Sequence, residues 1–302
     1  MKCFIKYLLS AVLVLVWLLP LTTYAKPFVT VQVSILPQKY FVERIGKDRV
    51  NVDVLVKPGK SPATYSPSPD QIKKLTSADV YFRIGVPFEN GILDKIQSIA
   101  GLKIVDTREG VVLRQMEDDD ARDHDHDADH HDDKEEHHDH VGDDPHIWMS
   151  PGNVKIQAHT IFQTLSSIDP DGRDVYQNNY DGFVKDLDEL DNRLTTVLKE
   201  LKGGNLFVFH PAFGYFTDAY GLRQIAVETM GKAPKGKALS AIIKLAKKEK
   251  TRVIFVQPQF DQNAAQKIAS AINGAVVSID PLAYDYLANM ENVAQSIAGA
   301  LK

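Results

Sequence analysis

The stretch VYQNNYDGFVKDLDELDNRLTTVLKELK, residues 175–202, divides the chain into two halves of similar design. Its apolar residues recur every three or four positions, which predicts one helix with a single apolar face. They are Phe183, Leu187, Leu190, Leu194, Val197 and Leu201. No proline interrupts the stretch and Gly203-Gly204 follow it, so we expect a helix of about 28 residues, roughly 42 Å long. A coiled-coil dimer is the alternative, but the polar face lacks sustained charge pairs and the stripe lasts only a few heptads. We expect an intramolecular strut between two lobes.

Both halves alternate short apolar strands with helices, which predicts a parallel α/β sheet in each half. We expect strands over 28–35, 50–56, 79–84 and 102–106, and again over 205–209, 223–227, 251–256 and 275–279. Among the helices, one should pass through 40–45 and end at Gly46, one should cover 152–166, and the last should begin near Met290. The expected fold class is α/β, with two lobes of mostly parallel sheet joined by one long rigid helix. The lobes are predicted as 26–174 and 203–302.

Residues 1–25 have the order of a secretory signal peptide: lysines, an apolar run over 8–19, and small residues ending at Ala25. An uncleaved anchor is the alternative, although the run is short for a span of roughly 20 residues. Cys3, the one cysteine, would leave with the signal. The mature protein would then contain neither disulfides nor thiolate metal ligands. We expect a periplasmic protein.

Residues 117–144 consist almost entirely of Asp, Glu and His, and hold seven of the ten histidines of the chain. They carry fifteen acidic and two basic residues, a net charge of −13, so the overall charge of −5 leaves +8 for the rest. Imidazoles and carboxylates at this density hold divalent cations loosely. We expect a disordered, metal-attracting loop. The remaining basic residues form no cluster with interleaved aromatics, so nucleic acid is not an expected partner.

Three residues outside this tract are candidate metal ligands because of their positions. His210 and Asp280 each follow a predicted strand and precede a proline, and His146 precedes a helix on the other side of the strut. Two imidazoles and one carboxylate suit a divalent ion such as Zn²⁺. Each also has a structural explanation, since a His beside Pro is often a loop residue and an Asp before Pro is often a turn residue. His159 lies inside a predicted helix, and we interpret it as structural.

Several motifs together resemble a known family. They are Pro58-Gly59 to Tyr65 with Pro69, DPHIWMSP at 144–151, HPAFGYF at 210–216, Gly231-Lys232, QPQF at 257–260 and Asp280-Pro281-Leu282. In this order they resemble the zinc- and manganese-receptor proteins of ABC importers. The resemblance implies two α/β lobes on a rigid helix, and His146, His210 and Asp280 as metal ligands. A histidine at position 210 resembles the zinc-type members, whereas manganese-type members tend to carry Glu.

The chain departs from the family pattern at Ala63. The family usually reads Pro-His-x-Tyr in the first-lobe loop, where this chain has Pro62-Ala63-Thr64-Tyr65. A methyl group cannot coordinate a metal, so a water or a histidine of the acidic tract would have to replace the lost ligand, or the ion would differ or bind weakly. The tract offers His124, His126, His130, His131, His137, His138 and His140.

The sequence therefore predicts a periplasmic receptor that captures a divalent transition metal and delivers it to an ABC permease and ATPase, as a monomer. Zn²⁺ is the expected ion, with Mn²⁺ or another divalent metal as alternatives. Three protein ligands and an open position also describe a catalytic zinc site, with Glu228 as candidate general base. No HExxH or Ser/His/Asp pattern supports a zinc-dependent hydrolase, and a buried ion pair or a cap is the simpler role for Glu228. A metal buffer or adhesin is the third possibility.

The acidic tract gives a first testable prediction. Deleting it should leave the fold intact and should slow zinc capture at scarce metal, because a dense cluster of carboxylates and imidazoles raises the local cation concentration. Stopped-flow association with a zinc indicator would measure the capture rate, and circular dichroism would measure the fold. Unfolding of the deleted protein would contradict the expectation.

Overall fold

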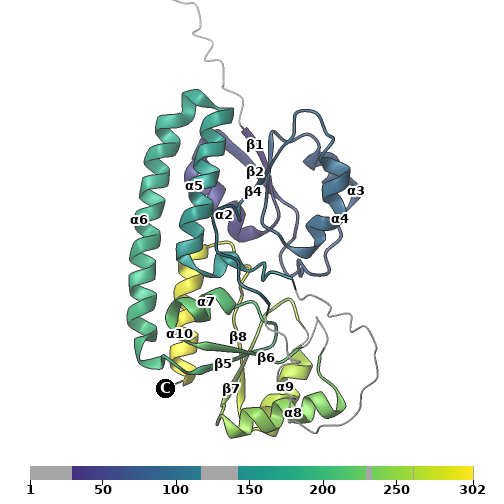
Figure 1. The fold of residues 1–302 in the computed structure, drawn as a ribbon, viewed down its shortest axis with the longest axis vertical. Coiled ribbons are helices and arrows are strands. Elements are labelled where there is room, and N and C mark those ends of the chain that lie inside the picture. Colours follow the sequence, from purple (N-terminus) through teal and green to yellow (C-terminus); the bar gives the residue numbers. More distant parts are fainter. Residues whose placement is uncertain (1–28, 117–141, 229–232, 261, 302) are drawn as a thin grey trace, which may run out of the picture.

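The computed structural model describes residues 29–116, 142–228, 233–260 and 262–301. The predicted signal peptide, the Gly231-Lys232 turn and residues 117–141 of the acidic tract lie outside these ranges. The described chain forms two α/β lobes beside a long helical spine (Figure 1). No helix in these ranges has the length and apolarity needed to cross a membrane.

The first lobe contains a parallel sheet of four strands in the order β2-β1-β3-β4. The strands are β1 (Val29–Val33), β2 (Val50–Val54), β3 (Val80–Arg83) and β4 (Lys103–Asp106). The helices are α2 (Leu36–Gly46), α3 (Pro69–Leu75) and α4 (Asn90–Ile96). Figure 1 shows α3 and α4 on the side of the sheet away from the spine.

The second lobe repeats this order as β6-β5-β7-β8, again with every pair parallel. The strands are β5 (Asn205–Val208), β6 (Arg223–Ala226), β7 (Val253–Val256) and β8 (Ala275–Ser278). The helices are α7 (Gly214–Tyr220), α8 (Gly236–Lys248), α9 (Gln262–Ala271) and α10 (Tyr286–Leu301). The predicted α/β class with two parallel sheets is confirmed.

The spine is the predicted strut. After α5 (Pro151–Ile168) and a single 3-10 turn at Pro170–Gly172, α6 runs from Arg173 to Leu198 and ends in a second 3-10 turn at Lys199–Leu201. Figure 1 shows α6 running from the top of the first lobe down to the level of β5 in the second, with α5 and α10 beside it. The apolar face of α6 is buried within the same chain, so the strut is intramolecular.

The two lobes share one hydrophobic core along α6. Phe183, fully buried in α6, packs against Phe41 of α2 with 5.9 Å between ring centroids, and Phe41 meets Tyr286 of α10 edge to face at 5.1 Å. The core that contains these rings continues without a break from the first sheet to the second. An aromatic chain from one lobe to the other through the spine therefore fixes the lobes relative to each other.

Helix α2 passes through 40–45 and ends at Gly46 as predicted, whereas the start of α10 differs from the prediction. Helix α2 begins at Leu36, because Pro37 occupies its first turn, where no backbone N–H is needed. Gly46 is its last helical residue and no left-handed cap: a Cβ there would overlap the side chain of Val50, and the positive φ of 48° belongs to Lys47. Helix α10 begins at Tyr286, four residues before Met290.

The shared core predicts a large effect of one substitution in the spine. Phe183→Ala should lower the free energy of unfolding by about 3–5 kcal/mol, because it removes a fully buried aromatic ring and leaves a cavity. Urea unfolding monitored by circular dichroism measures this. The matched control on the same helix is Val175→Ala, whose side chain is 42% exposed and should change stability by less than about 0.5 kcal/mol. Equal effects of the two would contradict a shared core.

Candidate metal centre

The carboxyl ends of all eight strands face the gap between the lobes. The residues that follow them line a main cavity of about 530 Å³ and a smaller one of about 220 Å³. The first lobe contributes loop 61–63 after β2, Gly85 after β3 and Arg108 after β4, and the second lobe contributes His210, Glu228 and Phe260. In parallel sheets ligands bind at this edge. The two sheet edges therefore form the two walls of one cleft.

His146 lies between these walls, held by the carboxylate two residues before it. It precedes the 3-10 turn Ile147–Met149, and its side chain is almost fully buried. Its Nδ1 donates to Asp144 Oδ1 at 2.7 Å, and its backbone N–H donates to the same oxygen at 2.9 Å. These two bonds fix both the ring and the tautomer, so Nε2 keeps its lone pair.

Asp144 is itself fully buried at the junction of the lobes. Arg114 Nη1 donates to its Oδ2 at 3.1 Å, and Tyr215 of α7 donates to its backbone carbonyl at 3.1 Å. Burial would raise the pKa of Asp144, but its contacts with His146 and Arg114 outweigh burial and hold the pKa below its usual value. The assignment of 117–144 as one disordered loop is wrong at its end, because Asp144 is an ordered part of the site.

His210 follows β5 and is held in the same way by Glu228, which follows β6. The Nδ1 of His210 donates to Glu228 Oε1 at 2.5 Å, and Gln257 forms two hydrogen bonds with the His210 backbone. The ring of Phe260 stacks on His210 with 4.7 Å between centroids. Burial lowers the pKa of His210, opposed by its bond to Glu228, so the imidazole is neutral at pH 7. Glu228 is buried, as expected from the sequence, but its partner is this imidazole, so the contact is a hydrogen bond in place of the expected ion pair.

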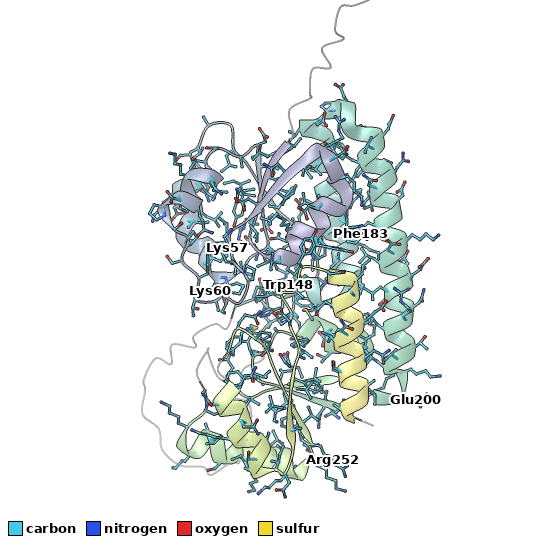
Figure 2. The ribbon with its side chains drawn as sticks, turned by 180° about the vertical axis from the view of Figure 1, so that it is seen from behind. Lys57, Lys60, Trp148, Phe183, Glu200 and Arg252 are labelled. Atoms are coloured by element: carbon cyan, nitrogen blue, oxygen red, sulfur yellow. The ribbon has the colours of Figure 1, made fainter. Side chains whose placement is uncertain are left out.

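The structure brings the two predicted imidazoles together. The rings of His146 and His210 lie edge to face with 5.2 Å between centroids, and Trp148 packs on His146 at 5.2 Å. Figure 2 shows Trp148 at the level where the two lobes meet. Both rings are anchored through Nδ1, so each has Nε2 available as a ligand. In zinc sites imidazoles are usual ligands, and a carboxylate usually holds the ring nitrogen that does not bind the metal.

Asp280, the third predicted ligand, does not join this pair. It follows β8 and lines the smaller cavity beside Lys57, Gly59 and Lys60. Its Oδ1 accepts hydrogen bonds from Gln259 Nε2 at 2.8 Å and from the backbone N–H of Leu282 at 2.9 Å. In the described ranges no three His, Cys, Asp or Glu side chains are grouped to hold a metal. His159 lies on α5, away from the main cavity, against Phe162 and Tyr180.

Two buried oxygen atoms beside the imidazoles fit a cation. Among the described residues, Glu228 Oε2 and Gln259 Oε1 are buried acceptors without a hydrogen-bond partner, and both residues line the main cavity. Buried polar atoms are nearly always paired, so unpaired buried acceptors on two residues that line the same cavity as the imidazoles suit a site for a positive ion. The wall of the first lobe contributes Ala63, which has no ligand atom in its side chain, as the sequence indicates.

The residues that hold the imidazoles carry weaker signals in the sequence. Asp144 could have been recognised from its spacing, because an Asp two residues before His146 can accept from both its backbone and its ring. Glu228 and Gln259 offered no such signal. Glu228 is 18 positions from His210 in the chain, and the two meet only because β5 and β6 are neighbours in the sheet.

Two parallel α/β lobes on a helical spine, with carboxylate-anchored imidazoles in the cleft between them, define a bilobal metal receptor. The family described as "Zinc-uptake complex component A periplasmic" matches residues 31–300, and the chain belongs to this family. The high-affinity zinc uptake system protein ZnuA of Yersinia pestis is 27% identical over 272 residues, which cover 85% of this chain and 86% of that protein. A crystal structure of ZnuA is 36% identical and superposes with a TM-score of 0.81 over 91% of this chain and 100% of that chain.

The relatives also include longer proteins. The zinc-binding lipoprotein AdcA of Streptococcus pneumoniae is 27% identical over 243 residues, which cover 78% of this chain and 46% of AdcA, so the chain spans about half the length of that relative. Members of the family are solute-binding receptors of metal ABC importers, periplasmic or extracellular, that work with a permease and an ATPase. The predicted zinc-type receptor class is confirmed at this level.

The packing around Asp144 predicts a specific effect at Gly214. A Cβ at this position would overlap Arg114 Nη1 and lie 2.7 Å from Asp144 Oδ2. Gly214→Ala should therefore destabilise the protein by about 1–3 kcal/mol and weaken zinc binding about tenfold or more, because it displaces the support of His146. Thermal unfolding and competition titration measure the two effects. Gly182→Ala, where nothing lies within 4 Å, is the control: it should leave zinc affinity unchanged and raise stability by about 0.5–1 kcal/mol, because Ala is the better helix former. Unchanged zinc affinity in Gly214→Ala would contradict the role of the hydrogen bonds from Arg114 to Asp144 and from His146 to Asp144 in positioning the imidazole.

Proposed function

We propose that this protein captures Zn²⁺ in the cleft between its lobes through Nε2 of His146 and Nε2 of His210, and delivers it to an ABC permease and ATPase. The observation that carries the proposal is the pair of imidazoles, 5.2 Å apart, each with Nδ1 held by a buried carboxylate. Two nitrogen ligands favour Zn²⁺ over Mn²⁺, which prefers oxygen. Direct ligation by Asp280 stays a prediction from the sequence.

The two anchoring carboxylates also supply charge. Asp144 and Glu228 are both nearly inaccessible to solvent and together carry two negative charges opposite a dication. In a buried site such compensation is strong, because the local dielectric is low. A cavity of about 530 Å³ has room for water as further ligands, which supports water in the place of the imidazole absent at Ala63.

Binding without catalysis is part of the proposal. A hydrolase would need a general base poised over metal-bound water, and Glu228 is instead occupied by the Nδ1 of His210, on the side of the ring away from Nε2. We further propose that the protein works as a monomer, and that its signal peptide directs it to the periplasm and is cleaved after Ala25. A buffer or adhesin would bind zinc equally well but would not support zinc uptake with a permease and ATPase.

The test is metal binding by histidine variants. His146→Ala and His210→Ala should each weaken zinc binding by about a hundredfold or more, beyond the 10–100-fold that loss of an outer partner costs. Competition titration with a zinc chelator and elemental analysis of the purified mature protein measure this. His159→Ala, on the exposed side of α5, is the matched control and should bind like wild type. If all three variants retain zinc with wild-type affinity, the proposed site is wrong.

A further inference from the structure

One arrangement occurs three times around the cleft. In each case a histidine or glutamine side chain that lines the main cavity has one of its nitrogen atoms held by a carboxylate. The pairs are His146 Nδ1 with Asp144 at 2.7 Å, His210 Nδ1 with Glu228 at 2.5 Å, and Gln259 Nε2 with Asp280 at 2.8 Å. In the two histidine pairs this bond leaves the other ring nitrogen free to act as a ligand. The third pair repeats the pattern with an amide.

From this pattern we propose that the side-chain oxygen of Gln259 is the third protein ligand of the metal, and that Asp280 is the positioning residue that holds the amide. The inference rests on the proposed function and adds a ligand to its site. Nothing in the resemblance to metal receptors assigns this role to Gln259.

The orientation of the Gln259 amide supports the proposal. Only the NH₂ end can donate to the carboxylate of Asp280, so the oxygen lies on the other end of the amide. That oxygen is buried and has no hydrogen-bond partner among the described residues. A buried carbonyl oxygen without a donor is rare, and a cation is one of the few partners that explains it. Phe260, the next residue, stacks on His210, so the turn that carries the amide packs directly against the imidazole.

Asp280 is poorly placed to coordinate the metal itself. Its Oδ1 accepts from Gln259 and from the backbone N–H of Leu282, and its backbone carbonyl accepts from Asn289 of α10 at 2.7 Å. It lines the smaller cavity and is absent from the lining of the main one, whereas Gln259 lines both cavities and shares the main one with the two histidines. Direct ligation would have to use Asp280 Oδ2 from the side of the smaller cavity, since Oδ1 already accepts two hydrogen bonds. Ligation through Gln259 requires no rearrangement of Asp280.

The donor set that follows is two imidazole nitrogens and one amide oxygen, all neutral, with three carboxylates behind them. Water would complete the four ligands that Zn²⁺ usually takes. An amide oxygen is a weaker donor than a carboxylate, because it carries no net charge. A receptor with such a ligand would exchange its metal more readily than one with a carboxylate ligand.

Two substitutions give opposite results for the two possible ligands. Gln259→Leu removes the amide at similar size and should weaken zinc binding by about 10–100-fold. Asp280→Asn keeps an oxygen that can accept from Gln259 Nε2, so zinc affinity should stay within about threefold of wild type. If Asp280 coordinates the metal directly, Asp280→Asn should weaken binding strongly and Gln259→Leu should not. That result, or equal effects of both substitutions, would overturn the inference.

A third variant tests the positioning role of Asp280. Asp280→Leu cannot accept from Gln259 and should weaken binding about as much as Gln259→Leu, whereas the Asn variant restores it. The matched control is Gln266→Leu on the exposed face of α9, which should leave zinc affinity unchanged. Zinc alone is the probe, by competition titration, and thermal unfolding without zinc confirms that each variant folds. Wild-type affinity in Asp280→Leu would overturn the positioning role.

The histidine variants separate this inference from the proposed function. Loss of zinc binding in His210→Ala together with wild-type binding in Gln259→Leu would overturn only the role of Gln259. Wild-type binding in His146→Ala and His210→Ala would overturn the proposed site as a whole.

Discussion

The buried apolar face of α6 is the constraint on which the rest of the structure depends. Phe183 and the leucines below it are the surface against which both lobes pack, and the aromatic rings of Phe41 and Tyr286 extend that contact from one lobe to the other. A continuous core resists shear, because its side chains interdigitate at close to crystal density. The two sheet edges therefore face each other across a fixed gap, and the cleft exists before any ion arrives.

Contacts at the back of the cleft combine structural and functional roles. Trp148 packs on His146 and donates through Nε1 to the carbonyl of Pro281 at 2.7 Å, and Tyr215 bonds the backbone of Asp144. Figure 2 places Trp148 where the lobes join, and Lys57 and Lys60 on the edge of the first lobe that faces the second. The same residues that join the lobes thus orient the imidazoles, so the ligand geometry is as rigid as the junction.

The two walls of the cleft differ in chemistry. The described donors come from segment 144–149 and from the second lobe, whereas the first lobe presents Ala63 and two arginines already paired with carboxylates. Arg83 contacts Glu89 at 3.3 Å, and Arg108 contacts Asp106 at 2.7 Å. Paired charges of opposite sign leave this wall close to neutral. Because Ala63 supplies no imidazole, the described ligand candidates are His146 between the walls and the residues of the second lobe, and the first-lobe sheet edge mainly encloses the cavity.

The sequence by itself determined the strut, the two parallel sheets and the pairing of His146 with His210, because hydrophobic periodicity and positions after strands are local properties of the chain. The sequence pattern placed the start of α10 four residues too late. It carried no signal for the short helix α7, since short helices depend on their packing. Only the tertiary structure decided the carboxylate that holds His210 and the amide that Asp280 holds. Glu228 meets His210 across neighbouring strands, and Asp280 accepts from Gln259 of the turn after β7. These partners lie 18 and 21 positions apart in the chain and meet only because the fold brings their segments into contact, which no local pattern encodes.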